Sequence, residues 1–205
     1  MSRPATRRQV FRGAIAGVGT DEGTRIVVGH WPTSPWGPFT DAMVQRPDDH
    51  RVLLAPHEEA VAFVAATYRF DETRVEPVEL TTSDVAWRLR AASLTLDLEL
   101  GGRTGLGRLL RLVPRRIAES PAWCSLTDPV ARTFLTGVRT RGDTGDRREW
   151  YGATDHRRVV ALAGDWEGVD LGGLRRVEPP TTFGFSSTPP TPSVTSVATT
   201  VELPA

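Results

Sequence analysis

The alternation of hydrophobic and polar residues along the chain predicts mainly β-strands. Its clearest stretch is Ser93–Leu100 (SLTLDLEL), where leucine alternates with polar residues, as in a strand with one buried face. With Thr73–Thr82 and Val85–Ala91 before it, this stretch predicts three successive antiparallel strands joined by short turns. Further strands are expected at Gln9–Val18, Thr24–Trp31, Gly137–Arg141, Arg148–Thr154, Arg158–Ala163 and Ser193–Leu203.

Two segments follow the helical period instead. Pro56–Tyr68 opens with proline and two nearby glutamates, which suit the first turn of a helix. In the second segment, at about residues 104–135, apolar residues share one side and arginines take the others. The apolar residues are Leu106, Leu109, Leu110 and Val113, and the arginines are Arg108, Arg111, Arg115 and Arg116.

The stretch His30–Pro56 concentrates tryptophan, proline and histidine. The prolines within residues 32–38 prevent regular pairing in a central strand and predict a rigid loop. Phe39–Gln45 and Arg51–Ala55 then form a predicted hairpin around a polar turn. Strand alternation places Asp41 and the other odd-numbered residues of the first strand on one face.

These elements predict one α+β domain over residues 1–205. The sheet is expected to be mostly antiparallel and strongly curved or barrel-like, with a few covering helices. A chain of 205 residues with 39% hydrophobic and 24% charged residues is long and apolar enough to bury one large core. The second helical segment is then an insert between two β-rich portions.

Charge and composition argue against several classes of function. The 25 basic residues balance the 25 acidic ones, so no overall field attracts nucleic acid or an anionic membrane. All 25 basic residues are arginine, and without lysine a Schiff base requires the N-terminal amine. No apolar run approaches the roughly 20 residues of a membrane span. We therefore expect no nucleic-acid partner and no membrane partner.

A cytoplasmic location is expected. The single cysteine, Cys124, has no partner for an internal disulfide or a cysteine-based zinc site. Arg7-Arg8 is only superficially similar to an export signal, because the apolar run that follows is short and ends in acidic residues.

No motif indicates a cofactor or a metal. Gly101–Gly107 joins a strand to a helix but fits neither the dinucleotide-binding nor the P-loop spacing, so a tight connection is expected. His30, His50, His57 and His156 include no pair at a metal-ligand spacing. A G-x-S-x-G elbow is also missing from the sequence.

The strand behind the rigid loop projects one carboxylate, Asp41, beside apolar residues, which suits an acid placed in a pocket. His30 is its candidate partner in acid–base catalysis. An outward-facing aspartate on a half-exposed strand is the alternative. The residues expected to bind a ligand are Ser34, Trp36, Phe39, Met43, Arg51, Arg90, Arg148, Trp150 and Tyr151. In this hypothesis one of the arginines holds a ligand carboxylate.

The residues Ser34-Pro-Trp-Gly37-Pro-Phe39-Thr-Asp41 resemble the S-x-x-G-x-[YF]-x-E stretch of acetoacetate decarboxylase and its relatives. The resemblance implies a barrel-like fold and an active-site role for Asp41, where aspartate replaces glutamate. The family's Schiff-base lysine has no counterpart, so decarboxylation through an imine is not implied. The whole chain also resembles a family of actinobacterial proteins to which we attach no activity.

The leading hypothesis is a small-molecule-binding protein of acetoacetate decarboxylase-like fold, for an organic acid or a carbonyl compound. One alternative is a lyase, isomerase or hydrolase that uses Asp41 and His30 as acid and base. Another is a structural or interaction domain with no pocket. An enclosed cavity lined by Asp41 and aromatic residues favours the first two hypotheses. The expected partner is a small organic molecule, and a homo-oligomer is left open.

Overall fold

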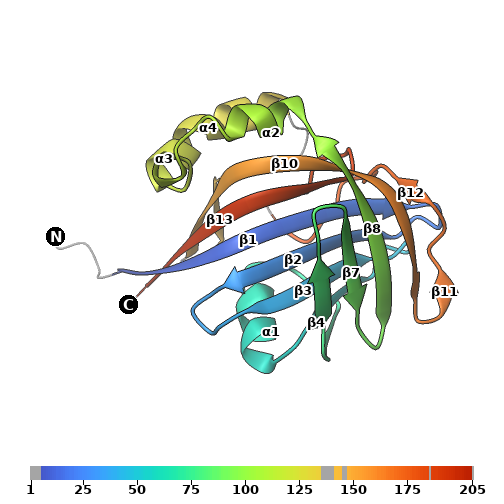
Figure 1. The fold of residues 1–205 in the computed structure, drawn as a ribbon. Coiled ribbons are helices and arrows are strands. Elements are labelled where there is room, and N and C mark those ends of the chain that lie inside the picture. Colours follow the sequence, from blue (N-terminus) through green and yellow to red (C-terminus); the bar gives the residue numbers. More distant parts are fainter. Residues whose placement is uncertain (1–5, 135–140, 145–146, 185, 205) are drawn as a thin grey trace.

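The computed structural model describes residues 6–134, 141–144, 147–184 and 186–204, whose strands all belong to one sheet (Figure 1). The strands are β1 (Thr6–Thr20), β2 (Arg25–Thr33), β3 (Phe39–Gln45), β4 (Arg51–Ala55), β5 (Glu72–Val75), β6 (Glu79–Thr82), β7 (Ala86–Arg90), β8 (Leu94–Arg103), β9 (Arg141–Thr144), β10 (Arg147–Trp166), β11 (Val169–Asp170), β12 (Leu174–Arg175) and β13 (Ser193–Pro204). The main order is β5-β4-β3-β2-β1-β13-β10-β8-β7-β6, with β9 and β11 paired to β10 and β12 paired to β1. The described pairs are antiparallel except β4 with β5, which confirms the predicted mostly antiparallel sheet.

The sheet curls until strands near its two ends share one core. Val28 and Ala42 from β2 and β3 belong to the same buried cluster as Trp87 and Leu96 from β7 and β8. These strands are far apart in the strand order, so their side chains meet only because the sheet bends back on itself. The predicted strong curvature is therefore confirmed.

The sheet has one face toward this shared core, and the helices cover its opposite face. They are α1 (Glu58–Ala65), α2 (Gly105–Leu110), α3 (Arg115–Ala118) and α4 (Pro121–Phe134). Figure 1 shows α2–α4 over β10, and each of the three contacts that strand. The helices predicted at about residues 104–135 are present, whereas the strand predicted at 137–141 falls mostly outside the described residues. No helix in the described part of the chain combines the length and apolarity that crossing a membrane requires.

Two predicted strand assignments are corrected. Thr73–Thr82 is two strands, because Pro77 has no N–H to pair and β5 runs parallel to β4. Arg148–Thr154 and Arg158–Ala163 are parts of one long strand, β10. Register shifts between residues 153 and 161 keep this strand paired with both neighbours.

Element bounds also differ from the prediction. α1 spans Glu58–Ala65 rather than Pro56–Tyr68. His57 precedes it as the N-cap, and its Nδ1 accepts a hydrogen bond from the Ala60 N–H at 3.2 Å. β2 continues through Pro32, where a register shift in the pairing with β1 accommodates a residue without an N–H.

The connection from β8 to α2 is as tight as its glycine-rich sequence predicts. Thr104 caps α2, because its Oγ1 accepts a hydrogen bond from the Gly107 N–H at 3.0 Å. Gly107 lies directly against β10, where a Cβ would come within 2.2 Å of the His156 carbonyl oxygen. The missing side chain therefore lets the backbone of α2 approach the strand.

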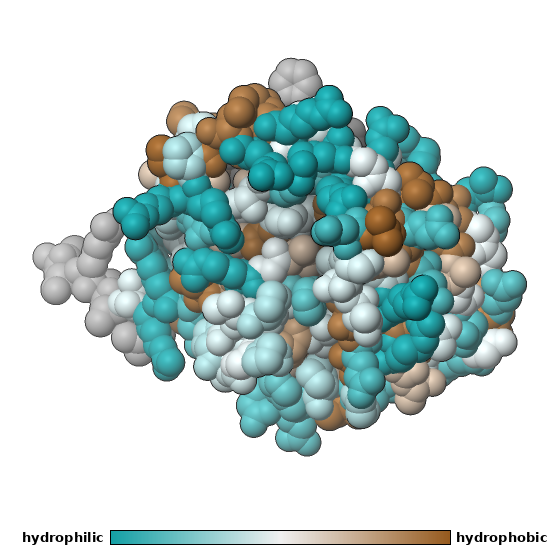
Figure 2. All heavy atoms as spheres, viewed as in Figure 1, coloured by the Kyte–Doolittle hydropathy of each residue, from teal (hydrophilic) through white to brown (hydrophobic). Residues whose placement is uncertain are grey.

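The outer surface of the helical layer carries both charges and apolar side chains. Figure 2 shows hydrophobic residues beside hydrophilic ones over the helices. The exposed apolar residues there are Leu109, Leu112, Ile117 and Leu126. The arginines Arg108, Arg111, Arg115 and Arg116 are exposed, in agreement with the predicted polar sides.

Candidate functional site

Asp41 lies on β3, on the face of the sheet that the helices cover. It pairs with Gly29 of β2, and alternation along β2 puts Trp31 on the same face. A Cβ on Gly29 would lie 2.5 Å from Asp41 Oδ1 and 2.6 Å from Trp31 Nε1. The glycine therefore leaves the space in which the aspartate and the tryptophan meet.

Asp41 is buried, with only 3% of its surface exposed, so the outward-facing alternative is wrong. Trp31 Nε1 donates a hydrogen bond to Asp41 Oδ1 at 2.8 Å. Burial raises the pKa of Asp41 to about 7, although the Trp31 hydrogen bond acts in the opposite direction. Asp41 is thus partly protonated near neutral pH, where it is able to accept or donate a proton.

Asp41 borders a small chamber of about 60 Å³. Its walls are mainly apolar and come from Phe11, Ile15, Val27, Trp31, Phe39, Met43, Phe63, Val64 and Val201. The polar residues around it are Asp41, Thr67, Tyr68, Glu149, Tyr151 and Thr199. Two carboxyl groups and two phenol groups therefore meet in a mainly apolar space.

Glu149 is the second buried carboxyl group of the small chamber. Its Oε1 accepts a hydrogen bond from Thr67 Oγ1 at 2.8 Å, and its Oε2 accepts one from the Tyr151 hydroxyl at 2.7 Å. The Tyr151 hydroxyl also forms a hydrogen bond with the Tyr68 hydroxyl. Burial raises the pKa of Glu149 and of both tyrosines. Tyr68 and Asp41 both line the small chamber, so the Tyr68 end of these hydrogen-bonded groups faces the same space as Asp41.

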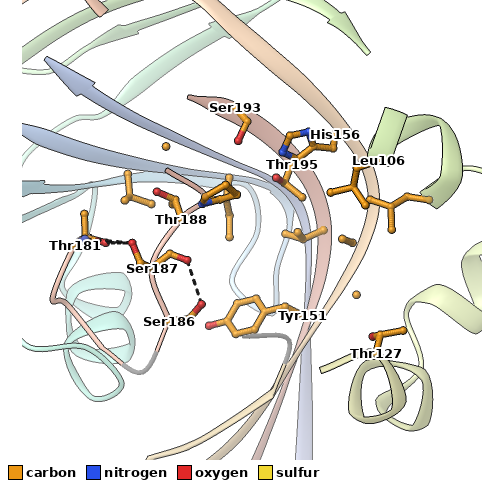
Figure 3. Close-up of a pocket in the computed structure, with 18 of the residues that line it drawn as sticks. Leu106, Thr127, Tyr151, His156, Thr181, Ser186, Ser187, Thr188, Ser193 and Thr195 are labelled. Atoms are coloured by element: carbon orange, nitrogen blue, oxygen red, sulfur yellow. Dashed lines mark hydrogen bonds between the residues drawn. The ribbon is translucent and has the colours of Figure 1, made fainter. Parts of the chain in front are cut away.

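A larger chamber of about 610 Å³ adjoins the small one. The two share the lining residues Ile15, Val27, Met43, Tyr68 and Tyr151. The larger chamber lies between the sheet, the helical layer and residues 181–183 and 186–189 (Figure 3). Its apolar walls include Leu106, Leu109, Leu110, Val113, Trp123, Phe183 and Val197. The apolar side predicted for the second helical segment thus covers a cavity between the helices and the sheet.

The described residues that line the larger chamber carry no charged side chain. Among the described residues that line it there is no arginine, aspartate or glutamate. Burial lowers the pKa of its histidine, His156, so the ring is neutral at pH 7. A charged ligand group would have no counter-ion here, and burying an unpaired charge is strongly unfavourable.

The structure brings some of the sequence-predicted site residues together. Those that line the small chamber are Phe39, Asp41, Met43 and Tyr151. His30 does not join them, because it lies on the opposite face of β2. There its Nδ1 is 3.2 Å from Thr40 Oγ1 and its ring lies against that of Trp87. His30 and Asp41 therefore form no acid–base pair.

The predicted arginines lie outside both chambers. Arg51 forms an ion pair with Asp71, with 2.9 Å between Nε and Oδ2. Arg90 pairs with Asp97 at 2.7 Å between Nη1 and Oδ1, and Arg148 is exposed on β10. The structure therefore brings none of these guanidinium groups to a ligand carboxylate in either chamber.

Three other predicted residues line neither chamber. Ser34 donates a hydrogen bond to a carbonyl oxygen of its own proline-rich loop. Trp36 packs on neighbouring phenylalanines behind the small chamber and is 38% exposed. Trp150 is buried, and its indole N–H donates to Ser125 Oγ of α4 at 3.3 Å.

Sequence reasoning missed several residues that the fold brings to the cavity. Tyr68 was expected only as the end of a helix, and Glu149 and His156 only as parts of strands or as an unpaired histidine. One signal was present, because Glu149 and Tyr151 are two apart in a strand and therefore share a face. The contribution of His156 depends on a helix that approaches β10 from a different part of the chain.

Two further chemistries find no support among the described residues. No three or more His, Cys, Asp and Glu side chains there are grouped in a way that holds a metal ion. Cys124 is buried, and burial raises the pKa of its thiol to about 11, so the thiol is protonated at neutral pH.

No protein-family model and no curated protein matches the chain. Among solved structures, it is similar to an acetoacetate decarboxylase from Legionella pneumophila subsp. pneumophila str. Philadelphia 1. The identity is 8% and the TM-score 0.45, over 99% of this chain and 86% of that one. A second acetoacetate decarboxylase gives 8% identity and a TM-score of 0.43, over 98% and 87% of the two chains. An acetoacetate decarboxylase-like enzyme from Sphingomonas wittichii RW1 gives 9% and 0.35, over 100% and 92%.

Proposed function

We propose that the protein binds an uncharged, mainly apolar small molecule that carries a carbonyl or hydroxyl group. The observation that carries this proposal is the larger chamber of about 610 Å³, whose described lining residues are mainly apolar and include no charged one. Its volume lies in the range of small-molecule sites, which are mostly apolar with a few placed polar groups. A chamber of this kind favours ligand binding over an interaction domain without a pocket.

The chemistry of the cavity favours a carbonyl compound over an organic acid. An anionic ligand finds no cation among the described lining residues of the larger chamber, and in the small one it meets Asp41 and Glu149. A neutral carbonyl oxygen needs only a hydrogen-bond donor, and the phenol group of Tyr68 lines both chambers. Since the chain contains no lysine, we propose that the site acts without a lysine imine.

A matched pair of probes tests this proposal. We expect 2-decanone to raise the melting temperature of the protein in a concentration-dependent way, and decanoate at the same concentration and pH 7.5 to leave it unchanged. The reason is that the two probes share an apolar chain and differ in charge. Differential scanning calorimetry measures both effects, and stabilisation by decanoate alone would contradict the proposal.

Two tryptophan substitutions locate the binding. Ala153 lines the larger chamber, so Ala153→Trp fills part of it and should abolish the shift caused by 2-decanone. Val169 is exposed on β11, so Val169→Trp adds the same side chain outside the chamber and should keep the shift. An equal response of both variants would mean that the ketone binds elsewhere.

Proton transfer to a bound carbonyl compound is a second candidate function. The observation that favours it is a buried Asp41 in the same chamber as the hydrogen-bonded series Tyr68–Tyr151–Glu149. This series takes the place of His30 as the acid–base partner of Asp41. In the proposed step, the Asp41 carboxylate takes a proton from the carbon next to the carbonyl group. The step requires the protonated form of Glu149, which burial favours: the Glu149 carboxyl group then donates to Tyr151 and Tyr151 to Tyr68, the reverse of the direction for ionised Glu149, so that the Tyr68 hydrogen is available to the ligand. Tyr68 gives its proton to the carbonyl oxygen and receives one from Glu149 through Tyr151, which yields an enol. Reversal restores the ketone.

This second function predicts hydrogen exchange without net reaction. In D₂O the protein should accelerate the replacement of the α-hydrogens of 2-decanone by deuterium, as followed by NMR. Asp41→Asn should reduce the exchange to the uncatalysed rate, since the amide does not accept the proton. Tyr68→Phe should reduce the exchange rate by about a hundredfold to a thousandfold, the usual contribution of one positioned proton donor. If 2-decanone binds but its hydrogen exchange is not accelerated, the second function is wrong and only ligand binding stands.

A further inference from the structure

Three buried polar atoms around the larger chamber have no hydrogen-bond partner in the described part of the chain. They are His156 Nε2, Thr188 Oγ1 and Ser193 Oγ. His156 is 8% exposed and Ser193 only 1% exposed. Buried polar atoms in folded proteins are nearly always paired, so three unpaired ones beside a single cavity point to a ligand group that pairs with them.

The three side chains lie near one another although they come from different segments. On β13, Ser193 pairs with Gly17 of β1, and Thr195 two residues further pairs with His156 of β10. The Thr188 side chain lies over Gly17, because a Cβ there would come within 2.4 Å of its Oγ1. Figure 3 shows Ser193, His156 and Thr188 on the same side of the pocket, away from Tyr151.

The ring of His156 is held in place from its other nitrogen. Its Nδ1 lies 2.9 Å from Thr104 Oγ1, the group that also caps α2. The Thr104 N–H donates to the His156 carbonyl oxygen at 3.1 Å, which fixes the same two segments together. The ring therefore has a fixed orientation, with Nε2 as its remaining polar atom.

We propose that His156, Ser193 and Thr188 form a subsite for a hydroxyl group of the ligand, so that the neutral, mainly apolar ligand carries a hydroxyl group in addition to the carbonyl group assigned to it above. This inference rests on the proposed function, because it requires a ligand in the larger chamber. To the proposed function it adds a hydroxyl group on the ligand and the three residues that recognise this group.

A hydroxyl group fits this subsite better than other polar groups do. If the Thr104 hydroxyl donates to Nδ1, then Nε2 carries a hydrogen and donates to the ligand; in the other tautomer Nε2 accepts. A ligand hydroxyl satisfies either form, because it both donates and accepts. The serine and threonine hydroxyls have the same double capacity. A carboxylate is disfavoured, since the described residues of the chamber supply no cation.

Two isomeric probes test the subsite. 1-Decanol and 1-methoxynonane contain the same atoms, but only the alcohol donates a hydrogen bond. Isothermal titration calorimetry should give about tenfold tighter binding of the alcohol to the full chain, because the ether leaves buried partners unpaired. Equal affinities would overturn the subsite while leaving the proposed function intact. Binding of neither probe would overturn both.

Variants assign the preference to these side chains. Ser193→Ala keeps the contact between His156 and Thr104 and should remove most of the preference for the alcohol, with the affinity for the ether unchanged. His156→Phe should act in the same direction. Removing the His156 imidazole also removes the contact with Thr104, the residue that caps α2. Ser193→Ala leaves this contact intact and is therefore the deciding variant. A full preference for the alcohol in Ser193→Ala would contradict the proposal.

Discussion

Asp41→Asn is expected to make the protein more stable at pH 8 and to change its stability little at pH 4. Burial raises the pKa of Asp41 from 3.8 to about 7, so the folded protein favours the protonated carboxyl group. The stability linked to that proton is fully present below pH 3.8 and is lost as the pH rises through 7. Asparagine has a similar shape, stays neutral and still accepts the hydrogen bond of Trp31.

The difference between the two pKa values corresponds to about 4 kcal/mol in the free energy of unfolding. Urea denaturation at several pH values should therefore show the gap between Asp41→Asn and the parent protein growing to this order between pH 4 and pH 8. Asp97→Asn is the matched control, because the Arg90 hydrogen bond lowers the pKa of Asp97 at the surface. Asp97→Asn should lower the free energy of unfolding slightly at pH 8, the opposite sign to Asp41→Asn. A gap for Asp41→Asn that does not change with pH would contradict the burial of an ionisable Asp41.

Gly107→Ala is expected to lower the free energy of unfolding by about 1 to 3 kcal/mol, the usual range for overpacking a close contact. A Cβ at this position would lie 2.2 Å from the His156 carbonyl oxygen, which is backbone and has little room to move. Helix α2 then has to withdraw from β10, and the wall of the larger chamber formed by Leu106 and Leu110 moves with it. Urea denaturation measures the stability loss.

Gly105→Ala is the matched control for this substitution. Gly105 is exposed in the same helix, and a Cβ there meets no atom within 4 Å. Alanine also favours the helix over glycine, so we expect a change between zero and a gain of about 1 kcal/mol. If both substitutions destabilised the protein equally, α2 would not be seated against β10 through Gly107.

The local sequence pattern predicted the strand hairpin and the face on which Asp41 lies. Phe39–Gln45 and Arg51–Ala55 have the predicted bounds, and Phe39, Asp41 and Met43 from the same face of β3 line the small chamber. The prediction that His30 and Asp41 act together as acid and base is wrong because of the register between β2 and β3. Gly29, not His30, stands opposite Asp41, so His30 belongs to the other face.

The rest of the site depends on contacts between distant parts of the chain. Thr67 and Glu149 are more than 80 residues apart in the sequence, and so are Tyr68 and Tyr151. Periodicity describes which residues share a face within one element, but it does not state which elements meet. The apolar side of the helix at Leu106 and Leu110 was correctly predicted, whereas the cavity beneath it required the three-dimensional structure.

The central claim is that a neutral apolar molecule occupies the larger chamber. NMR with ¹³C-labelled leucine and valine methyl groups tests it directly in the presence of 2-decanone. Intermolecular NOEs are expected from the ketone to the lining residues Leu106, Leu110 and Val197, and none to the exposed Leu112 and Leu126. NOEs to Leu112 or Leu126 alone, or no NOE at a saturating concentration, would contradict the account.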